Sequence, residues 1–119
     1  MGEMQMGVIE TRFAQIIWER EPITTSELVS AAAEELGWKR TTAYTVLKRL
    51  CDKGIFRNDG GVITSLISHD EFYAIRSERF INEEFKGSLP AFLTAFTSRK
   101  ALSEQEIEQL RAMIDSYGE

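Results

Sequence analysis

The sequence predicts a mainly α-helical protein in two parts: three helices followed by a β-hairpin over residues 1–68, and a further helical region over residues 69–119. Two observations support this prediction. Apolar residues recur every three or four positions in several segments, which is the spacing of amphipathic helices. After the third of these segments, two β-prone runs flank a Gly-rich turn, a pattern typical of a hairpin.

The first helix is expected from about Val8 to Glu19, because Pro22 cannot continue a helix. Its apolar stripe consists of Ile9, Phe13, Ile16 and Ile17. A second helix begins at a capping box, in which the Thr24 hydroxyl covers a free amide and the Glu27 carboxylate reaches back. It ends at Gly37, and its inward positions are Leu28, Ala31, Ala32 and Leu36.

Only two residues separate Gly37 from a third helix, which is expected from Lys39 or Arg40 to Lys53 and ends at Gly54. Its inward stripe is Ala43, Val46, Leu47 and Leu50. Its outward positions are polar and basic, namely Arg40, Thr41, Tyr44, Thr45 and Lys48. Two helices joined by a tight turn, the second with a basic free face, are typical of a helix-turn-helix.

The hairpin is expected from the runs Ile55–Arg57 and Val62–Ile67 around the turn Asn58-Asp59-Gly60-Gly61. Three helices followed by a hairpin is the element order of a winged helix. This order is more specific than any one of its elements. The sequence therefore predicts a mainly α winged helix-turn-helix domain over residues 1–68.

Residues 69–119 are expected to form three helices: about Asp70–Lys86, Leu89–Thr97, and one that starts at a capping box at Ser103. About 50 residues in three short helices make a poor independent core. Because the segment is nevertheless rich in apolar residues, we expect an α-helical dimerisation region that buries them between two copies of the chain. The residues assigned to it are Phe72, Phe80, Ile81, Phe85, Leu89, Phe92, Leu93, Ile107, Leu110 and Ile114.

The net charge of −5 is unevenly distributed along the chain. Residues 39–57 hold six basic residues and one acidic residue, a net charge of +5, whereas residues 68–119 hold six and ten, a net charge of −4. Phosphate binding responds to the local field, because salt screens charges beyond about 8–10 Å. The basic segment therefore predicts contact with double-stranded DNA. The candidate residues are Lys39, Arg40, Thr41, Thr42, Tyr44, Thr45, Lys48, Arg49 and Arg57.

Within this set, Arg40 is the first candidate for a bidentate contact with guanine, the commonest specific contact to a base. A plain phosphate contact by Arg40 is the alternative. The acidic total charge and the short acidic hairpin favour a second interpretation of the whole domain, in which it is a protein–protein interaction module without sequence-specific DNA binding.

The sequence contains no pattern that indicates a catalytic site. The only histidine, His69, lies 18 positions from the only cysteine, Cys51, in a different element, so no nucleophile–base pair is indicated. No Gly-rich phosphate loop and no paired His or Cys ligands occur. No run approaches the ~20 apolar residues that span a bilayer, and no signal peptide is visible. We therefore expect a cytoplasmic protein that is not an enzyme, with no cofactor, metal or membrane partner.

Several stretches resemble the penicillinase-repressor family of winged-helix transcriptional regulators, which includes methicillin-resistance repressors and copper-transport repressors. The resemblance covers about Val8 to Ile114. The matching stretches are Ile16-Ile17-Trp18, Trp38-Lys39-Arg40-Thr41-Thr42, Leu47-Lys48-Arg49-Leu50, Lys53-Gly54-Ile55, Ser77-Glu78-Arg79-Phe80-Ile81-Asn82, Phe85-Lys86-Gly87, Leu102-Ser103, and Glu106-Ile107-Glu108-Gln109-Leu110.

This resemblance implies a homodimeric repressor on a palindromic operator, of the kind that controls antibiotic-resistance genes. The helix from Trp38 to Leu50 would lie in the major groove, the hairpin would touch the DNA backbone, and the C-terminal helices would interlock with those of the partner copy.

The resemblance also implies a site of regulation. In members that control β-lactam resistance, a membrane sensor-protease pathway cuts the repressor before a phenylalanine whose counterpart here is Phe96, so the corresponding bond is Ala95–Phe96. Three features depart from the family pattern. Ala95 stands where the best-known members have asparagine, Thr11 stands where many have tryptophan, and the paired cysteines of the copper-responsive branch are absent. Cleavage of this bond and DNA contact by the acidic hairpin remain open at this point.

Overall fold

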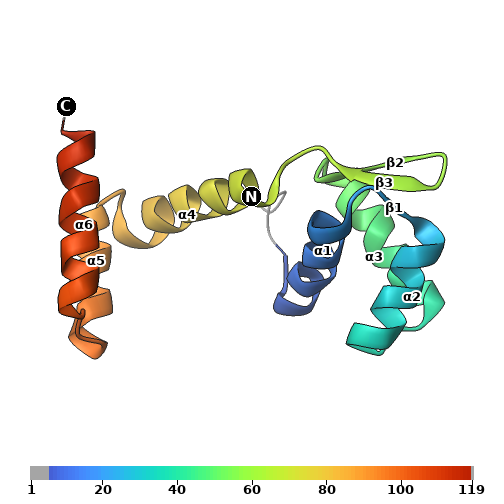
Figure 1. The fold of residues 1–119 in the computed structure, drawn as a ribbon, viewed down its shortest axis with the longest axis horizontal. Helices are drawn as coiled ribbons and strands as arrows, with labels where there is room; N and C mark the ends of the chain where they lie inside the picture. The colour runs from blue at the N-terminus through green and yellow to red at the C-terminus, as the bar shows by residue number, and fades with distance from the viewer. Residues whose placement is uncertain (1–5, 119) are drawn as a thin grey trace. The chain divides into compact units, whose positions relative to one another are not determined.

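The computed structural model describes residues 6–118 (Figure 1). It contains six helices and three short strands within that range: α1 (Val8–Arg20), β1 (Ile23–Thr24), α2 (Thr25–Leu36), α3 (Arg40–Asp52), β2 (Phe56–Asp59), β3 (Val62–Ser65), α4 (His69–Phe85), α5 (Leu89–Arg99) and α6 (Glu104–Tyr117). The protein is therefore mainly α-helical, as expected. The contacts divide it into two compact units, which meet between Ser77 and Glu78.

The first unit is a winged helix, which confirms the predicted fold class. α1 packs on α2, α2 packs on α3, and the strands form one antiparallel sheet in the order β1-β3-β2. The largest fully buried side chains of the core come from all of these layers and from the start of α4: Phe13, Phe56, Phe72, Ile17, Leu28, Leu50, Ile55 and Ile63. Ile9 was expected in the apolar stripe of α1 but is 47% exposed, because the buried stripe of this helix begins only at Phe13.

The capping boxes and the glycine stop that the sequence indicated are present at the helix ends. At the start of α2, the Glu27 amide donates to the Thr24 hydroxyl at 3.1 Å, and the Thr24 amide donates to the Glu27 carboxylate at 3.0 Å. The same capping box at Ser103 and Glu106 begins α6. Gly37 ends α2 with φ of 69°, a conformation that costs glycine nothing.

The hairpin turn is shorter than the four residues expected from the sequence. Asn58 and Asp59 belong to β2, and Asp59 pairs with Val62, so the turn consists of Gly60 and Gly61 alone. Both glycines have positive φ, 63° and 93°, as the favoured two-residue hairpin turns require. The Asn58 side-chain oxygen accepts a 2.9 Å hydrogen bond from the Gly61 amide and closes the turn.

Strand β1 was not expected from the sequence, because two residues are too short to show an alternating pattern. Ile23 and Thr24 pair with Ile63 and Val62 of β3. The neighbouring Glu21 carboxylate accepts hydrogen bonds from both the amide and the hydroxyl of Ser65. These contacts hold the hairpin against the end of α1.

The first turns of α4 pack with the winged helix. Trp18 donates from Nε1 to the Ile67 carbonyl at 3.0 Å, and its ring lies 5.4 Å from that of Phe72. Phe72 has 0% exposure within a single chain. Its assignment to the dimer surface is therefore corrected, since a partner cannot reach this side chain. The contacts group α4 up to Ser77 with the first unit, whereas the sequence-based division fell before this helix.

The second unit comprises the end of α4 together with α5 and α6. The rings of Phe80, Phe85 and Phe92 contact one another, with centroids 5.6 to 6.1 Å apart. Neither α5 nor α6 contains a buried residue. Among residues 6–118, no helix combines the length and apolar character that crossing a bilayer requires.

Candidate DNA-contacting surface

Helix α3 has one buried and one free face, and this division positions its polar side chains. The buried positions are Ala43, Val46, Leu47 and Leu50. The start of the helix is anchored by Trp38, whose ring stacks on Phe13 with centroids 4.9 Å apart. The predicted DNA-contacting positions on and just before this helix are all exposed: Lys39, Arg40, Thr41, Thr42, Tyr44, Thr45, Lys48 and Arg49.

Arg40 and Tyr44 form the first contact pair on this free face. The Arg40 Cζ lies 5.5 Å from the centroid of the Tyr44 ring, within the range of a cation–π interaction. A guanidinium that stacks flat on an aromatic ring keeps its N–H groups free in its own plane. These N–H groups are the donors that a bidentate contact with guanine or phosphate uses.

Three basic residues of the candidate set form ion pairs with carboxylates. Lys48 Nζ lies 3.0 Å from an Asp52 oxygen, Arg49 contacts Glu10 of α1, and Arg57 lies 3.5 Å from Asp59 within β2. The basic side chains are 48–76% exposed. Exposed ion pairs contribute only about 0–1 kcal/mol, so a DNA phosphate can replace Asp52 at Lys48 and Asp59 at Arg57 at little cost. Glu10 is only 19% exposed, so this argument does not extend to its pair with Arg49.

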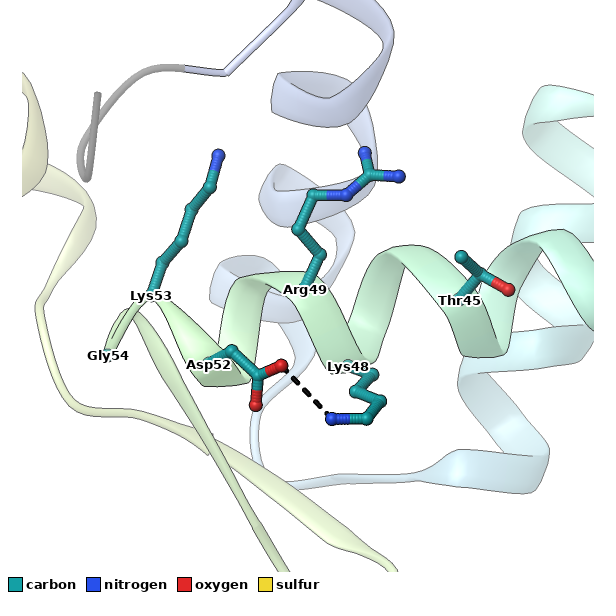
Figure 2. A pocket seen from close by; sticks show the side chains of 6 residues that line it. All are labelled: Thr45, Lys48, Arg49, Asp52, Lys53 and Gly54. Carbon is teal, nitrogen blue, oxygen red and sulfur yellow. Dashed lines mark hydrogen bonds and ion pairs between the residues drawn. The ribbon is translucent and has the colours of Figure 1, made fainter. Parts of the chain in front are cut away.

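A hollow of about 510 Å³ lies beside the C-terminal half of α3 (Figure 2). Figure 2 shows Arg49 and Lys53 extending from the same side of the helix, while Lys48 turns toward Asp52. The hollow is lined by Thr45, Lys48, Arg49, Asp52, Lys53 and Gly54. It combines three basic side chains with one carboxylate, so its lining carries a net positive charge.

Cys51 lies next to this surface and is half-buried. Burial raises the pKa of its thiol above the ordinary value, and the Asp52 carboxylate raises it further, against an opposing effect of Lys48. The thiol is therefore protonated at neutral pH. This environment is that of a partly buried structural cysteine, because a reactive cysteine requires a lowered pKa.

The sequence located the basic residues but missed their partners. Asp52 follows Lys48 by four positions on one helix, a spacing that places the two side chains together and was visible in the sequence. Glu10 lies 39 positions before Arg49, so no local pattern predicted that contact. Arg57, on β2, is the one predicted DNA-contacting residue outside the α3 segment. Within residues 6–118, no group of His, Cys, Asp and Glu could hold a metal ion.

Comparison with known proteins identifies the chain's relatives. The sequence profile of the penicillinase repressor family matches residues 6–116. The chain belongs to this family. Members of the penicillinase repressor family are transcriptional regulators and not enzymes, in agreement with the sequence.

Individual members of the family match over both units. The penicillinase repressor of Bacillus licheniformis is 26% identical over 117 residues, which cover 95% of this chain and 91% of that protein. The methicillin resistance regulatory protein MecI of Staphylococcus aureus is 26% identical over 115 residues, which cover 93% and 94%. A penicillinase repressor of Staphylococcus aureus is 21% identical over 117 residues, which cover 95% and 93%.

Proposed function

We propose that the protein is a homodimeric transcriptional repressor that binds a palindromic operator with α3 in the major groove. The exposed polar and basic face of α3, in the second helix of a helix-turn-helix, is the observation on which this proposal rests. Membership of the penicillinase repressor family supports it. The names of the relatives point to antibiotic-resistance genes as the regulated genes, and a regulator of this kind works in the cytoplasm with the DNA.

The side chains divide between two kinds of contact. Arg40 reads a base edge, and the hydroxyl-bearing residues of the first two turns of α3 contact bases or backbone. Lys39, Lys48 and Arg49 neutralise phosphates. Arg57 leaves Asp59 for a phosphate beside the hairpin, which is the contribution of the wing. The hydroxyl-bearing residues are Thr41, Thr42, Tyr44 and Thr45.

The second unit supplies the dimer contacts. In a single chain it exposes large apolar side chains, such as Leu89 at 55%, Phe80 at 48% and Ile114 at 62%. Pairing two copies removes this surface from water and presents two copies of α3 to half-sites about 34–36 Å apart. The proposed dimer residues are Phe80, Ile81, Phe85, Leu89, Phe92, Leu93, Ile107, Leu110 and Ile114.

A sensor-protease pathway is the proposed route of release. The bond between Ala95 and Phe96 lies inside α5, and both residues are exposed. A protease needs an extended substrate, so this helix must open before cleavage. Because α5 buries no residue within the chain, opening costs little once the dimer surface is disturbed.

The decisive experiment is a mobility shift with the DNA upstream of the protein's own coding region, over a series of salt concentrations. A scrambled fragment of equal length is the control. We expect tight binding to one discrete palindromic site, with log affinity falling about 0.9 per phosphate neutralised as log salt rises. A folded dimer that binds both fragments equally, or neither, contradicts the proposal.

A second candidate function is a protein–protein interaction module without sequence-specific DNA binding. The carboxylates beside Lys48, Arg49 and Arg57 favour it, because they partly neutralise the basic face. The salt series separates the two functions, since contact with a protein partner does not show the steep salt dependence of phosphate binding.

A further inference from the structure

A second hollow lies in the winged-helix unit, and none of the residues that line it belongs to α3. It measures about 300 Å³ and is lined by residues at the start of α1 and by one residue of α4. The lining residues are Met6, Val8, Thr11, Arg12, Gln15 and Arg76. Two guanidinium groups therefore face one hollow, and its lining contains no carboxylate.

Arg76 is held in place by aromatic rings. Its Cζ lies 5.4 Å from the centroid of Phe72 and 5.8 Å from that of Tyr73. Phe72 is fully buried, so this platform is rigid. A guanidinium that is already oriented loses less freedom when it binds an anion, which favours affinity.

Among residues 6–118, no ion pair neutralises either guanidinium. Within residues 6–118, the ion pairs of the winged-helix unit involve other basic residues, namely Arg20, Lys48, Arg49, Arg57 and His69. Two arginines that share a hollow without a carboxylate repel each other, and an anion between them removes that repulsion.

We propose that this hollow binds a small organic anion, in which a carboxylate or phosphate group is attached to a short apolar chain. The anionic group lies between Arg12 and Arg76, where each guanidinium donates two N–H groups. The Gln15 amide supplies a further donor. The apolar chain lies against Met6, which is 9% exposed, and Val8, which is 78% exposed and gains cover. The volume is at the lower end of ligand pockets, so the ligand is small.

The test uses the full-length protein and defined probes. Nitrogen–proton correlation spectra that include the arginine Nε signals are recorded with hexanoate, hexyl phosphate, acetate, inorganic phosphate and hexanol. We expect saturable shifts at Arg12 and Arg76 with one or both hexyl anions. Binding should be at least about tenfold weaker for acetate and inorganic phosphate, because they lack the apolar chain, and absent for hexanol, which lacks the charge. Comparison of hexanoate with hexyl phosphate identifies the anionic group.

Two variants and one control localise the binding. Arg12→Gln and Arg76→Gln should each weaken it at least about tenfold, whereas Arg111→Gln, on α6, should leave it unchanged. Non-saturable shifts, shifts at all arginines, or equal binding by Arg12→Gln and wild type overturn the proposal. A loss of operator affinity in Arg12→Gln without ligand also overturns it, because the pair would then be a DNA phosphate contact. Operator binding by wild type is measured separately, so the proposed repressor function is tested independently.

Discussion

The basic residues of the candidate DNA-contacting surface differ in whether DNA binding would break an ion pair. Lys48, Arg49 and Arg57 would each leave a carboxylate, whereas Arg40 lies near the Tyr44 ring and would leave none. Among the three arginines predicted to contact DNA, Arg40 is therefore the one that offers its N–H groups without breaking an ion pair. This difference makes Arg40 the better candidate for reading sequence, and the paired residues the better candidates for neutralising phosphates.

Replacing Arg40 tests this assignment. Arg40→Ala should weaken operator binding by about 1–3 kcal/mol, roughly 5- to 150-fold, because a bidentate contact to a base is lost. Binding to unrelated DNA should fall much less. Fluorescence anisotropy with both DNAs measures the ratio, and circular dichroism should show unchanged helix content. An unchanged ratio of the two affinities would identify Arg40 as a phosphate contact instead.

We expect Asp52 to limit the affinity of the same surface for phosphate, because it pairs with Lys48. Asp52→Asn removes a negative charge and frees Lys48 from its ion pair, so operator binding should become tighter and more salt-dependent. We expect the slope of log affinity against log salt to steepen by up to about 0.9. Glu108→Gln makes the same charge change on α6 and should leave the slope unaltered. A slope that stays constant in Asp52→Asn would show that the Asp52 charge does not limit phosphate neutralisation by Lys48.

The raised pKa of Cys51 gives a pH-dependent prediction. The folded state favours the protonated thiol, so this group contributes stability at neutral pH that is lost as pH rises through its folded pKa. Alkylation by iodoacetamide, which requires the thiolate, should therefore be slow at neutral pH and accelerate only at alkaline pH. The rate profile in native buffer should lie at higher pH than the profile in urea, and coincident profiles would contradict the prediction.

At the scale of elements, the sequence predicted features that local chemistry determines. The capping residues Thr24 and Ser103, the stop at Gly37 and the face of α3 all follow from side chains within one or two turns. Features that depend on distant partners were missed. β1 exists because β3 provides its pairing edge, and the hairpin turn is short because Asp59 pairs with Val62.

The two turn glycines provide a matched pair of substitutions. Gly61 has φ of 93°, outside the narrow left-handed region of other residues, so Gly61→Ala should lower the free energy of unfolding by about 1 kcal/mol or more. Gly60, at 63°, suits asparagine, and Gly60→Asn should be tolerated because Asn-Gly is a favoured hairpin turn. Urea unfolding followed by tryptophan fluorescence compares them, and equal losses would be inconsistent with this turn.

At the scale of the whole molecule, the two units differ in how far they bury their own apolar residues. The winged helix encloses a core with fully buried side chains, whereas α5 and α6 bury none. The sequence predicted this contrast, because the amount of apolar surface in a short segment is visible in its composition. It did not predict the role of Phe72, since only the packing against Trp18 shows that this ring belongs to the winged helix.

The same contrast leads to a test of the proposed dimer. Ile114 is 62% exposed in one chain, so Ile114→Asp should not unfold the chain but should place a charge in the apolar contact between two copies. Sedimentation should show a shift from dimer to monomer at micromolar concentration. Gln109→Asp adds the same charge at an exposed polar position of α6 and should leave the dimer intact.

Affinity for the operator should depend on formation of the dimer. A monomer carries one α3, so Ile114→Asp should lose most of its affinity for the full palindrome yet bind an isolated half-site as wild type does, because the winged-helix unit is unaltered. An unaltered dimer would exclude Ile114 from the interface. A monomer with full affinity for the palindrome would show that DNA itself brings the two copies together, and that the second unit has another role.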